Sequence, residues 1–276
     1  FRFNLGWNGV DANYYQNDLG FYNLRNDQRF WARIQFLTFE PTKFFEKIDA
    51  YLWLSERSRF YPKTLKSQGG RIGFTLTSLK LEEIKASFDY TSKYKDFEET
   101  RKDDVFIYQP AVYELEFSYK SDTRKKIAFG SGIEYSYGVN EEFNEDYNMT
   151  EIEFYSRFRF SNKFQMEFAA QIGQTDDEIG YVYNENDNIY FGNREVKYIE
   201  NNLSLNYNFD SYRSLSVIFR QFWSTANYKN NFFLLKNDGL RKFSEKNLKD
   251  YNPNTNFNLW NFDLSYDWEF APGSKI

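Results

Sequence analysis

Apolar and polar residues alternate along the segment 256–270, near the end of the chain. From residue 260 onward, one set of alternate positions holds large apolar side chains: Trp260, Phe262, Leu264, Tyr266, Trp268 and Phe270. The positions between them are polar: Asn261, Asp263, Ser265, Asp267 and Glu269. Because successive side chains of a strand point to opposite faces of its sheet, this period of two predicts a β-strand with one apolar and one polar face.

The same alternation recurs along the chain and predicts about twelve strands, joined by connections that alternate between short and long. Short turns are expected near Pro41, Ser78, Ser121, Asn162, Ser211 and Pro272. Long loops are expected at 9–28, 56–70, 93–110, 139–150, 174–196 and 226–255. This regularity is typical of an up-and-down membrane barrel, which has short periplasmic turns and long extracellular loops.

We therefore predict an all-β fold: an antiparallel up-and-down transmembrane β-barrel, with residues 1–276 as one outer-membrane domain. Phe1 begins within an alternating stretch and follows no signal peptide, and Lys275 begins another strand. An open strand edge in lipid leaves backbone groups unpaired, which costs several kcal/mol for each group. We therefore expect this segment to be incomplete at both ends and to belong to a larger barrel. The alternative is that a neighbouring chain covers the seam.

The composition agrees with this fold. The chain has 31 Phe, 23 Tyr and 6 Trp, yet its mean hydropathy is −0.77. Soluble domains build their cores mainly from aliphatic residues, whereas outer-membrane barrels combine polar interiors and loops with aromatic residues at the membrane interfaces. No run of about 18 apolar residues predicts a transmembrane helix. The alternative is a soluble barrel or sandwich with aromatic cross-strand pairs.

Two residue types are missing from the sequence, which contains no cysteine and no histidine. Disulfides, thiolate nucleophiles, Ser-His hydrolase sites and ordinary zinc sites are thereby excluded. The net charge of −5 argues against a nucleic-acid partner, whose phosphates require a basic surface. The sequence therefore assigns no catalytic, cofactor-binding or metal-binding residues and predicts a protein that is not an enzyme.

The polar faces of the expected strands carry charges of both signs. The candidate lumen-lining residues are Glu114, Glu116, Glu151, Glu153, Arg157, Arg159, Asp263 and Asp267. Such residues can line a water-filled pore and set its ion preference. They can equally form a closed network of ion pairs or a wall around a plug, and a barrel of about twelve to sixteen strands has room for either.

The expected loops offer two further kinds of site. Acidic residues cluster at 141–146, 176–178 and 185–187, and calcium takes several carboxylate oxygens as ligands. Their spacing matches no defined calcium loop, so solvated acidic loops are the favoured interpretation. Loop aromatics can stack on sugar rings or pack on one another over the barrel opening, and packing is favoured: Tyr14, Tyr15, Tyr181, Tyr183 and Tyr190.

Three stretches carry a family resemblance: Asn17-Asp18-Leu19-Gly20-Phe21, the strand 215–229 that ends in Ser-Thr-Ala-Asn-Tyr-Lys, and the run Trp-Glu-Phe-Ala-Pro-Gly-Ser at 268–274. They resemble a family of Bacteroidota outer-membrane β-barrels of unknown function, and the resemblance covers most of the chain. Members of that family often carry an N-terminal carbohydrate-binding domain of the family-nine type, which this sequence lacks. The resemblance implies an outer-membrane location and supplies no catalytic residues.

The expected function is therefore a non-enzymatic, integral outer-membrane β-barrel that passes or binds a solute. Its partners are membrane lipid and, through the resemblance alone, a saccharide ligand. The alternative is a structural or docking subunit of a larger complex of outer-membrane proteins. An outer-membrane hydrolase is a third hypothesis, which the absence of histidine disfavours.

Overall fold

A computed structural model describes residues 1–14, 25–139, 146–271 and 273–276. Its strands are β1 (Arg2–Val10), β2 (Asp27–Leu37), β3 (Phe45–Arg59), β4 (Thr64–Ser78), β5 (Glu83–Thr91), β6 (Tyr94–Asp96), β7 (Ile107–Gln109), β8 (Ala111–Lys120), β9 (Ile127–Val139), β10 (Tyr147–Arg159), β11 (Phe164–Glu185), β12 (Asn188–Asn208), β13 (Arg213–Leu235), β14 (Arg241–Asn247), β15 (Thr255–Ala271) and β16 (Ser274–Lys275). No helix of the described residues has the length and apolarity to cross a membrane.

The strands form one antiparallel sheet in the order β1-β2-β3-β4-β5-β8-β9-β10-β11-β12-β13-β15-β16, with β14 paired to β13. β6 and β7 form a separate two-stranded sheet. Leaving the short strands β6, β7, β14 and β16 out of the sixteen described strands gives twelve. The all-β antiparallel fold expected from the alternation is therefore confirmed. Twelve strands correspond to those expected. The main sheet also contains β14, which was not expected, and β16, which includes Lys275.

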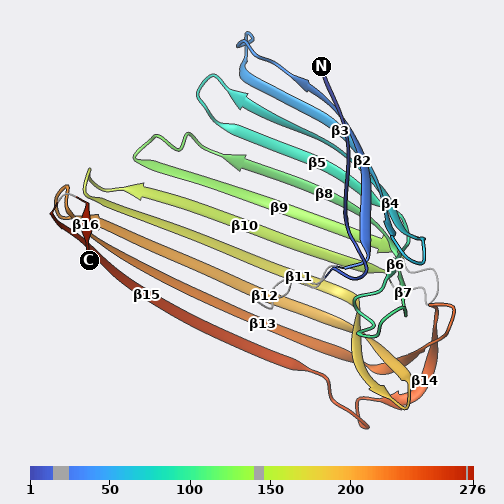
Figure 1. Ribbon diagram of the computed structural model, residues 1–276. Coiled ribbons are helices and arrows are strands. Elements are labelled where there is room, and N and C mark those ends of the chain that lie inside the picture. The colour runs from blue at the N-terminus through green and yellow to red at the C-terminus, as the bar shows by residue number, and fades with distance from the viewer. Residues whose placement is uncertain (15–24, 140–145, 272) are drawn as a thin grey trace.

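The sheet is curved and open (Figure 1), and β1 and β15 with β16 are its two edges. The prediction of a barrel is corrected in this respect, because β1 does not pair with β15 and the sheet of the described residues does not close. Alternation within strands determines which side chains share a face, but it carries no information about whether two distant edges meet. Insertion into a membrane stays a prediction.

Three expected long loops are largely strand, and this corrects their assignment. Arg59 pairs with Thr64, so most of 56–70 belongs to the β3–β4 hairpin. Glu185 pairs with Asn188, so β11 and β12 continue through 174–196, and β13 extends to Leu235. Polar residues continue these strands because the ladder is made by backbone N–H and C=O groups, whatever the side chains.

The other connections agree more closely with expectation. Short turns join β4 to β5, β8 to β9, β10 to β11 and β12 to β13 at the expected positions, and residues 38–44 join β2 to β3. The loop 93–110 contains the β6–β7 hairpin. Pro272 and parts of the expected loops 9–28 and 139–150 lie outside the described residues.

Cross-strand register produces one continuous apolar face. Phe117 pairs with Ile133, Ile133 with Ile152, and Ile152 with Ile172. Near the β15 edge, Phe219 pairs with Phe262. Paired residues of an antiparallel sheet point to the same side, so the separate alternations of the strands add up to a single surface. This surface is exposed: 64% of Phe262 and 46% of Ile133 are accessible.

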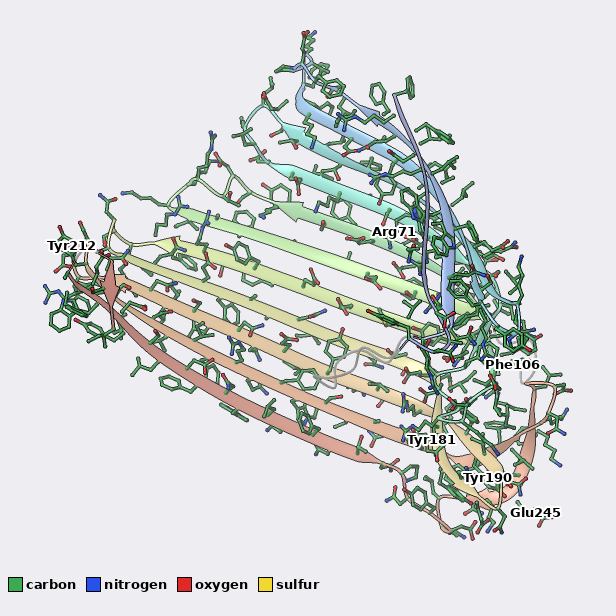
Figure 2. The ribbon with its side chains drawn as sticks, viewed as in Figure 1. Arg71, Phe106, Tyr181, Tyr190, Tyr212 and Glu245 are labelled. Carbon is green, nitrogen blue, oxygen red and sulfur yellow. The ribbon has the colours of Figure 1, made fainter. Side chains whose placement is uncertain are left out.

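The buried apolar residues lie at the end of the sheet that carries the long hairpins. One cluster contains Ile107, Ile179, Ile189 and Phe191, and a second contains Val182, Tyr190, Tyr228 and Phe232. Figure 2 shows Tyr181 and Tyr190 at this end and Tyr212 at the opposite end, where the short turns lie. The extended parts of β11, β12 and β13 therefore build a small core of their own beyond the two-faced sheet.

Candidate functional site

The second face of the sheet is polar. Glu116 pairs with Glu134, and Glu134 pairs with Glu151, so three carboxylates lie side by side on adjacent strands. The next pairs along β8 and β10 are Ser118 with Gly132 and Gly132 with Glu153. Asp263 pairs with Ile218, which pairs with Ser204, and this row leads through Glu167 to Arg157.

Register thus places all eight candidate lumen-lining residues on this polar face: Glu114, Glu116, Glu151, Glu153, Arg157, Arg159, Asp263 and Asp267. They do not form one compact cluster. Asp263 is paired separately with Arg220 at 2.7 Å, near the β15 edge. Their role as lumen-lining residues stays a prediction.

Hydrogen bonds and ion pairs link the acidic residues to neighbouring strands. Arg71 Nε lies 2.5 Å from Asp89 Oδ1, and Arg71 Nη2 lies 3.4 Å from Glu114 Oε1. Glu151 accepts hydrogen bonds from Gln171 Nε2, at 2.6 Å, and from the Tyr198 hydroxyl. Arg71 therefore offsets part of the negative charge at the β4–β5 side of the acidic rows.

The sign of the charge changes along the strands. On the polar face β8 carries, in chain order, Glu114, Glu116, Ser118 and Lys120; β10 carries Glu151, Glu153, Tyr155, Arg157 and Arg159. β8 and β10 both run from the long-hairpin end toward the short-turn end. Along these two strands the polar face is therefore acidic in its middle and basic toward the short turns. On the neighbouring strands Glu83 lies opposite Lys120, and Glu167 lies opposite Arg157.

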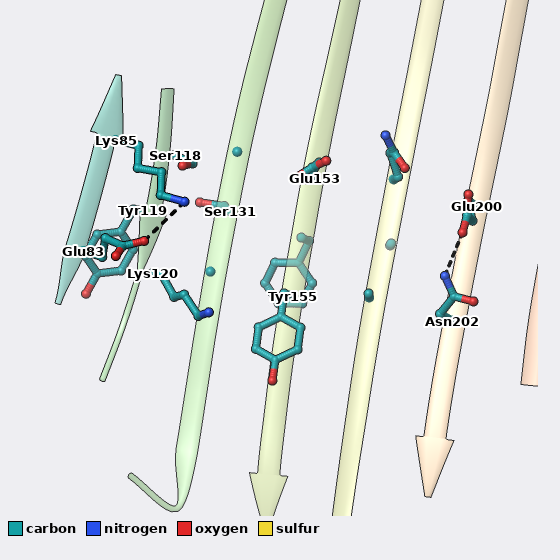
Figure 3. Close-up of a pocket in the computed structure, with 16 residues that line it drawn as sticks. Glu83, Lys85, Ser118, Tyr119, Lys120, Ser131, Glu153, Tyr155, Glu200 and Asn202 are labelled. Atoms are coloured by element: carbon teal, nitrogen blue, oxygen red, sulfur yellow. Dashed lines mark hydrogen bonds and ion pairs between the residues drawn. The ribbon is translucent and has the colours of Figure 1, made fainter. Parts of the chain in front are cut away.

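A hollow of about 370 Å³ lies where the acidic and basic zones meet (Figure 3). Its floor consists of small residues on three strands, Ser118 of β8, Gly130 and Gly132 of β9, and Ala169 of β11. Lys85 and Lys120 border one side, and Glu200 and Asn202 border the other (Figure 3). Glu153 and Tyr155 rise from β10 between them. The hollow exists because short side chains at paired positions leave space that longer neighbours surround.

A bridging segment, residues 94–109, crosses the polar face at the long-hairpin end. On one side Glu98 lies 3.3 Å from Lys66 of β4, and Asp104 pairs with Arg59 of β3. On the other side Lys102 Nζ lies 2.8 Å from Asp187 Oδ1, in the turn between β11 and β12. One short segment can contact both β3–β4 and the β11–β12 turn only if the sheet curves around that segment. The polar face is therefore the concave face at this end.

Further contacts fasten the bridging segment to β11 and to the β13–β14 hairpin. Glu99 accepts a hydrogen bond from the Tyr181 backbone N–H at 2.8 Å, and the Tyr108 N–H donates to the Gly239 carbonyl at 3.0 Å. Burial, followed by the charge of Asp96, raises the pKa of Tyr94, which keeps this phenol neutral. The hydrogen bond from Lys102 lowers the pKa of Asp187. Near neutral pH Tyr94 is therefore uncharged, and Asp187 is the carboxylate that pairs with Lys102.

Most of the expected loop aromatics pack on other rings. Tyr183 and Tyr190 stack with their centroids 4.7 Å apart, and Tyr251 lies 5.1 Å from Tyr183. Tyr181 meets Phe191 edge-on at 6.3 Å. Tyr14 is 48% exposed, and Tyr15 lies outside the described residues. Mutual packing is thus observed for three of the five tyrosines, while stacking on a sugar stays a prediction.

The acidic loop positions have basic or phenolic neighbours. Glu178 lies 2.7 Å from Arg194, and Glu185 lies 3.4 Å from Lys246. Asp146 accepts a hydrogen bond from the Tyr137 hydroxyl at 2.6 Å; residues 141–145 are not among the described residues. Within the ranges that the structure covers, no group of three or more carboxylates has the arrangement of a metal site.

Sequence reasoning missed three parts of this site. Glu134 lies between Glu116 and Glu151 but was not selected, although its position in the β9 alternation was a usable signal. The hollow was missed because it depends on which small residues lie opposite one another. The bridging segment was expected to be an ordinary long loop, and nothing in its composition indicates that it reaches across the sheet.

Together these features define an all-β protein whose open antiparallel sheet has one apolar and one polar face. The chain belongs to the family described as "Domain of unknown function (DUF5916)", whose model matches residues 1–276. No curated protein and no solved structure matches the chain.

Proposed function

We propose that this chain is part of an integral outer-membrane β-barrel, with its apolar face toward lipid. The observation that carries the proposal is the continuous exposed apolar face. Large apolar residues are exposed on β1 to β5, on β8 to β11 and on β15. Soluble proteins rarely expose a contiguous apolar patch larger than a few hundred Å² (about 300–600 Å²). Hydrocarbon would remove this surface from water while the polar face stays hydrated.

In this arrangement the polar face would pass or hold a polar solute, and the long hairpins would be extracellular. The charged residues and the hollow on the concave side support this role. A saccharide is one candidate, through the family resemblance stated above. We propose no enzymatic activity, because the chain supplies neither histidine nor cysteine and no established catalytic group.

The alternative is a docking subunit of a larger outer-membrane complex. The observation that favours it is the exposed apolar face, which another protein of the membrane could cover in place of lipid. Single-channel recordings in planar bilayers separate the two roles. Stable conductance supports solute passage, whereas no conductance together with co-purification of other outer-membrane proteins supports docking.

Lipid exposure should alternate residue by residue along β15. The chain contains no cysteine, so each introduced cysteine is a unique attachment point for a spin label. In lipid bilayers, labels at Phe262→Cys and Leu264→Cys should collide mainly with oxygen, which partitions into hydrocarbon. A label at Asp263→Cys should collide mainly with a water-soluble nickel complex. The three positions are adjacent and therefore lie at nearly the same depth, so each serves as the control for its neighbours.

A soluble sandwich gives a different pattern of collisions. Labels at residues 262 and 264 would then be shielded from both reagents by a second layer of protein. Equal access of the nickel complex at all three positions would also contradict the membrane proposal, because both faces of β15 would then be in water.

A further inference from the structure

We propose that the hollow on the polar face binds a zwitterionic solute with separated ammonium and carboxylate groups, such as a short peptide. The inference rests on the proposed solute-handling function and names the class of solute. The carboxylate would face the basic zone at Lys120, and the ammonium group would face the acidic zone at Glu153. Figure 3 shows both side chains: Lys120 comes from β8 and Glu153 from β10, the two strands that flank β9.

The charges that border the hollow are not all available to a ligand. Lys85 Nζ lies 3.5 Å from Glu83 Oε1, and the Glu200 carboxylate accepts a hydrogen bond from Asn202 at 2.8 Å. Lys120 and Glu153 are both exposed. Within the described ranges, the charged groups of Lys120 and Glu153 have no ion-pair or hydrogen-bond partner. Among the described residues the hollow therefore presents Lys120 and Glu153 as charged groups without a partner. Glu200 keeps its negative charge because the Asn202 amide is neutral, and Glu83 lies opposite Lys120 in register.

The charges beyond the hollow are arranged like this pair, with negative charge on the Glu153 side and positive charge on the Lys120 side. Toward the long hairpins lie Glu116, Glu134 and Glu151 in paired positions. Toward the short turns, Arg159 Nη1 donates to the Arg124 carbonyl oxygen at 3.0 Å, which adds positive charge beyond the hollow. An ion of either sign meets repulsion from one zone, whereas a dipolar molecule aligned with the field is attracted by both.

The shape of the hollow suits a short peptide. The glycines at 130 and 132 and the alanine at 169 leave the floor flat, so a narrow backbone can approach the sheet closely. Ser118 and Gln171 add groups that hydrogen-bond to a peptide amide. A volume of about 370 Å³ accommodates a dipeptide with some bound water.

Calorimetric titration of the full chain in detergent, at low ionic strength, tests the proposal with dialanine as the probe. We expect dissociation constants in the millimolar range that rise with salt, because both charges are exposed. N-acetyl-dialanine amide, which lacks both charges, should bind at least about tenfold more weakly. Lys120→Gln and Glu153→Gln should each weaken dialanine binding about fivefold, the loss expected for one exposed ion pair.

Matched controls are Lys242→Gln and Glu245→Gln, which remove the same charges from β14, whose residues do not line the hollow. Figure 2 shows Glu245 at the long-hairpin end, where Tyr190 also lies. These variants should bind dialanine like the unaltered chain. Equal binding of charged and blocked dipeptides, equal losses in the control variants, or binding of maltose but not dialanine would each overturn the proposal. The titration requires no bilayer, so its failure is distinguishable from failure of the spin-label test of membrane insertion.

Discussion

Replacing Phe191 by alanine is expected to release the bridging segment from the long-hairpin end of the sheet. Phe191 is fully buried, and its cluster includes Ile107 of β7, which is also fully buried. A Phe→Ala substitution in a packed core costs about 3–5 kcal/mol, through lost burial and the cavity that remains. Most of this loss should appear as easier local opening, because Ile107 contacts the sheet through this cluster.

Hydrogen exchange of the Tyr108 amide measures this opening, since that N–H bonds to the Gly239 carbonyl across the contact. The variant should exchange about a hundredfold faster or more, as a loss of about 3 kcal/mol implies. Phe44→Ala is the control, because Phe44 lies in a short turn and is 67% exposed. An unchanged exchange rate in Phe191→Ala would show that the cluster does not hold the bridging segment.

Asn in place of Asp27 is expected to destabilise β2 and β3 where they meet the bridging segment. The Asp27 carboxylate has a side-chain exposure of 6% and lies 2.7 Å from Arg57 Nε and 3.0 Å from Lys66 Nζ. Removing one partner from a buried ion pair costs about 3–5 kcal/mol, because the remaining charge stays desolvated. Glu98 still contacts both cations, at 3.7 Å and 3.3 Å, so we expect about 3 kcal/mol.

The measurement is hydrogen exchange of the β2 and β3 backbone amides at increasing urea concentration, which gives the midpoint at which these two strands unfold. Asp103→Asn makes the same chemical change in a carboxylate whose side chain is 79% exposed and pairs with Arg25. It should shift stability by less than about 1 kcal/mol, as exposed pairs do. Comparable shifts in the two variants would mean that the burial of Asp27 does not increase its contribution to stability.

Much of the fold could be predicted from local pattern. Side chains alternate in any strand because of backbone geometry, so the opposite orientations of Phe262 and Asp263 follow from the sequence directly. Short turns such as the one at Ser161 and Asn162 were predictable from turn-forming residues between two alternating runs. The ends of β11, β12 and β13 were not predictable, because polar residues can belong to a loop or continue a backbone ladder.

The candidate site was predictable only in part, for a related reason. The face of the sheet on which Glu116 and Glu151 each lie could be predicted from the alternation within their own strands. Their alignment through Glu134 depends on the register of two hairpins, and a register shift of one residue would move a whole strand to the other face. The floor of the hollow, with Gly130 beside Ala169 across β10, depends on three strands at once.

The sequence by itself determined where twelve of the strands lie and the division of each into an apolar and a polar side, since this division depends on neighbours two residues apart. Tertiary structure decided which face is concave, that the sheet stays open, and where the bridging segment lies. Lys102 and Asp187 meet across 85 residues of chain. Contacts of that range depend on the curvature of the assembled sheet, to which every strand between them contributes.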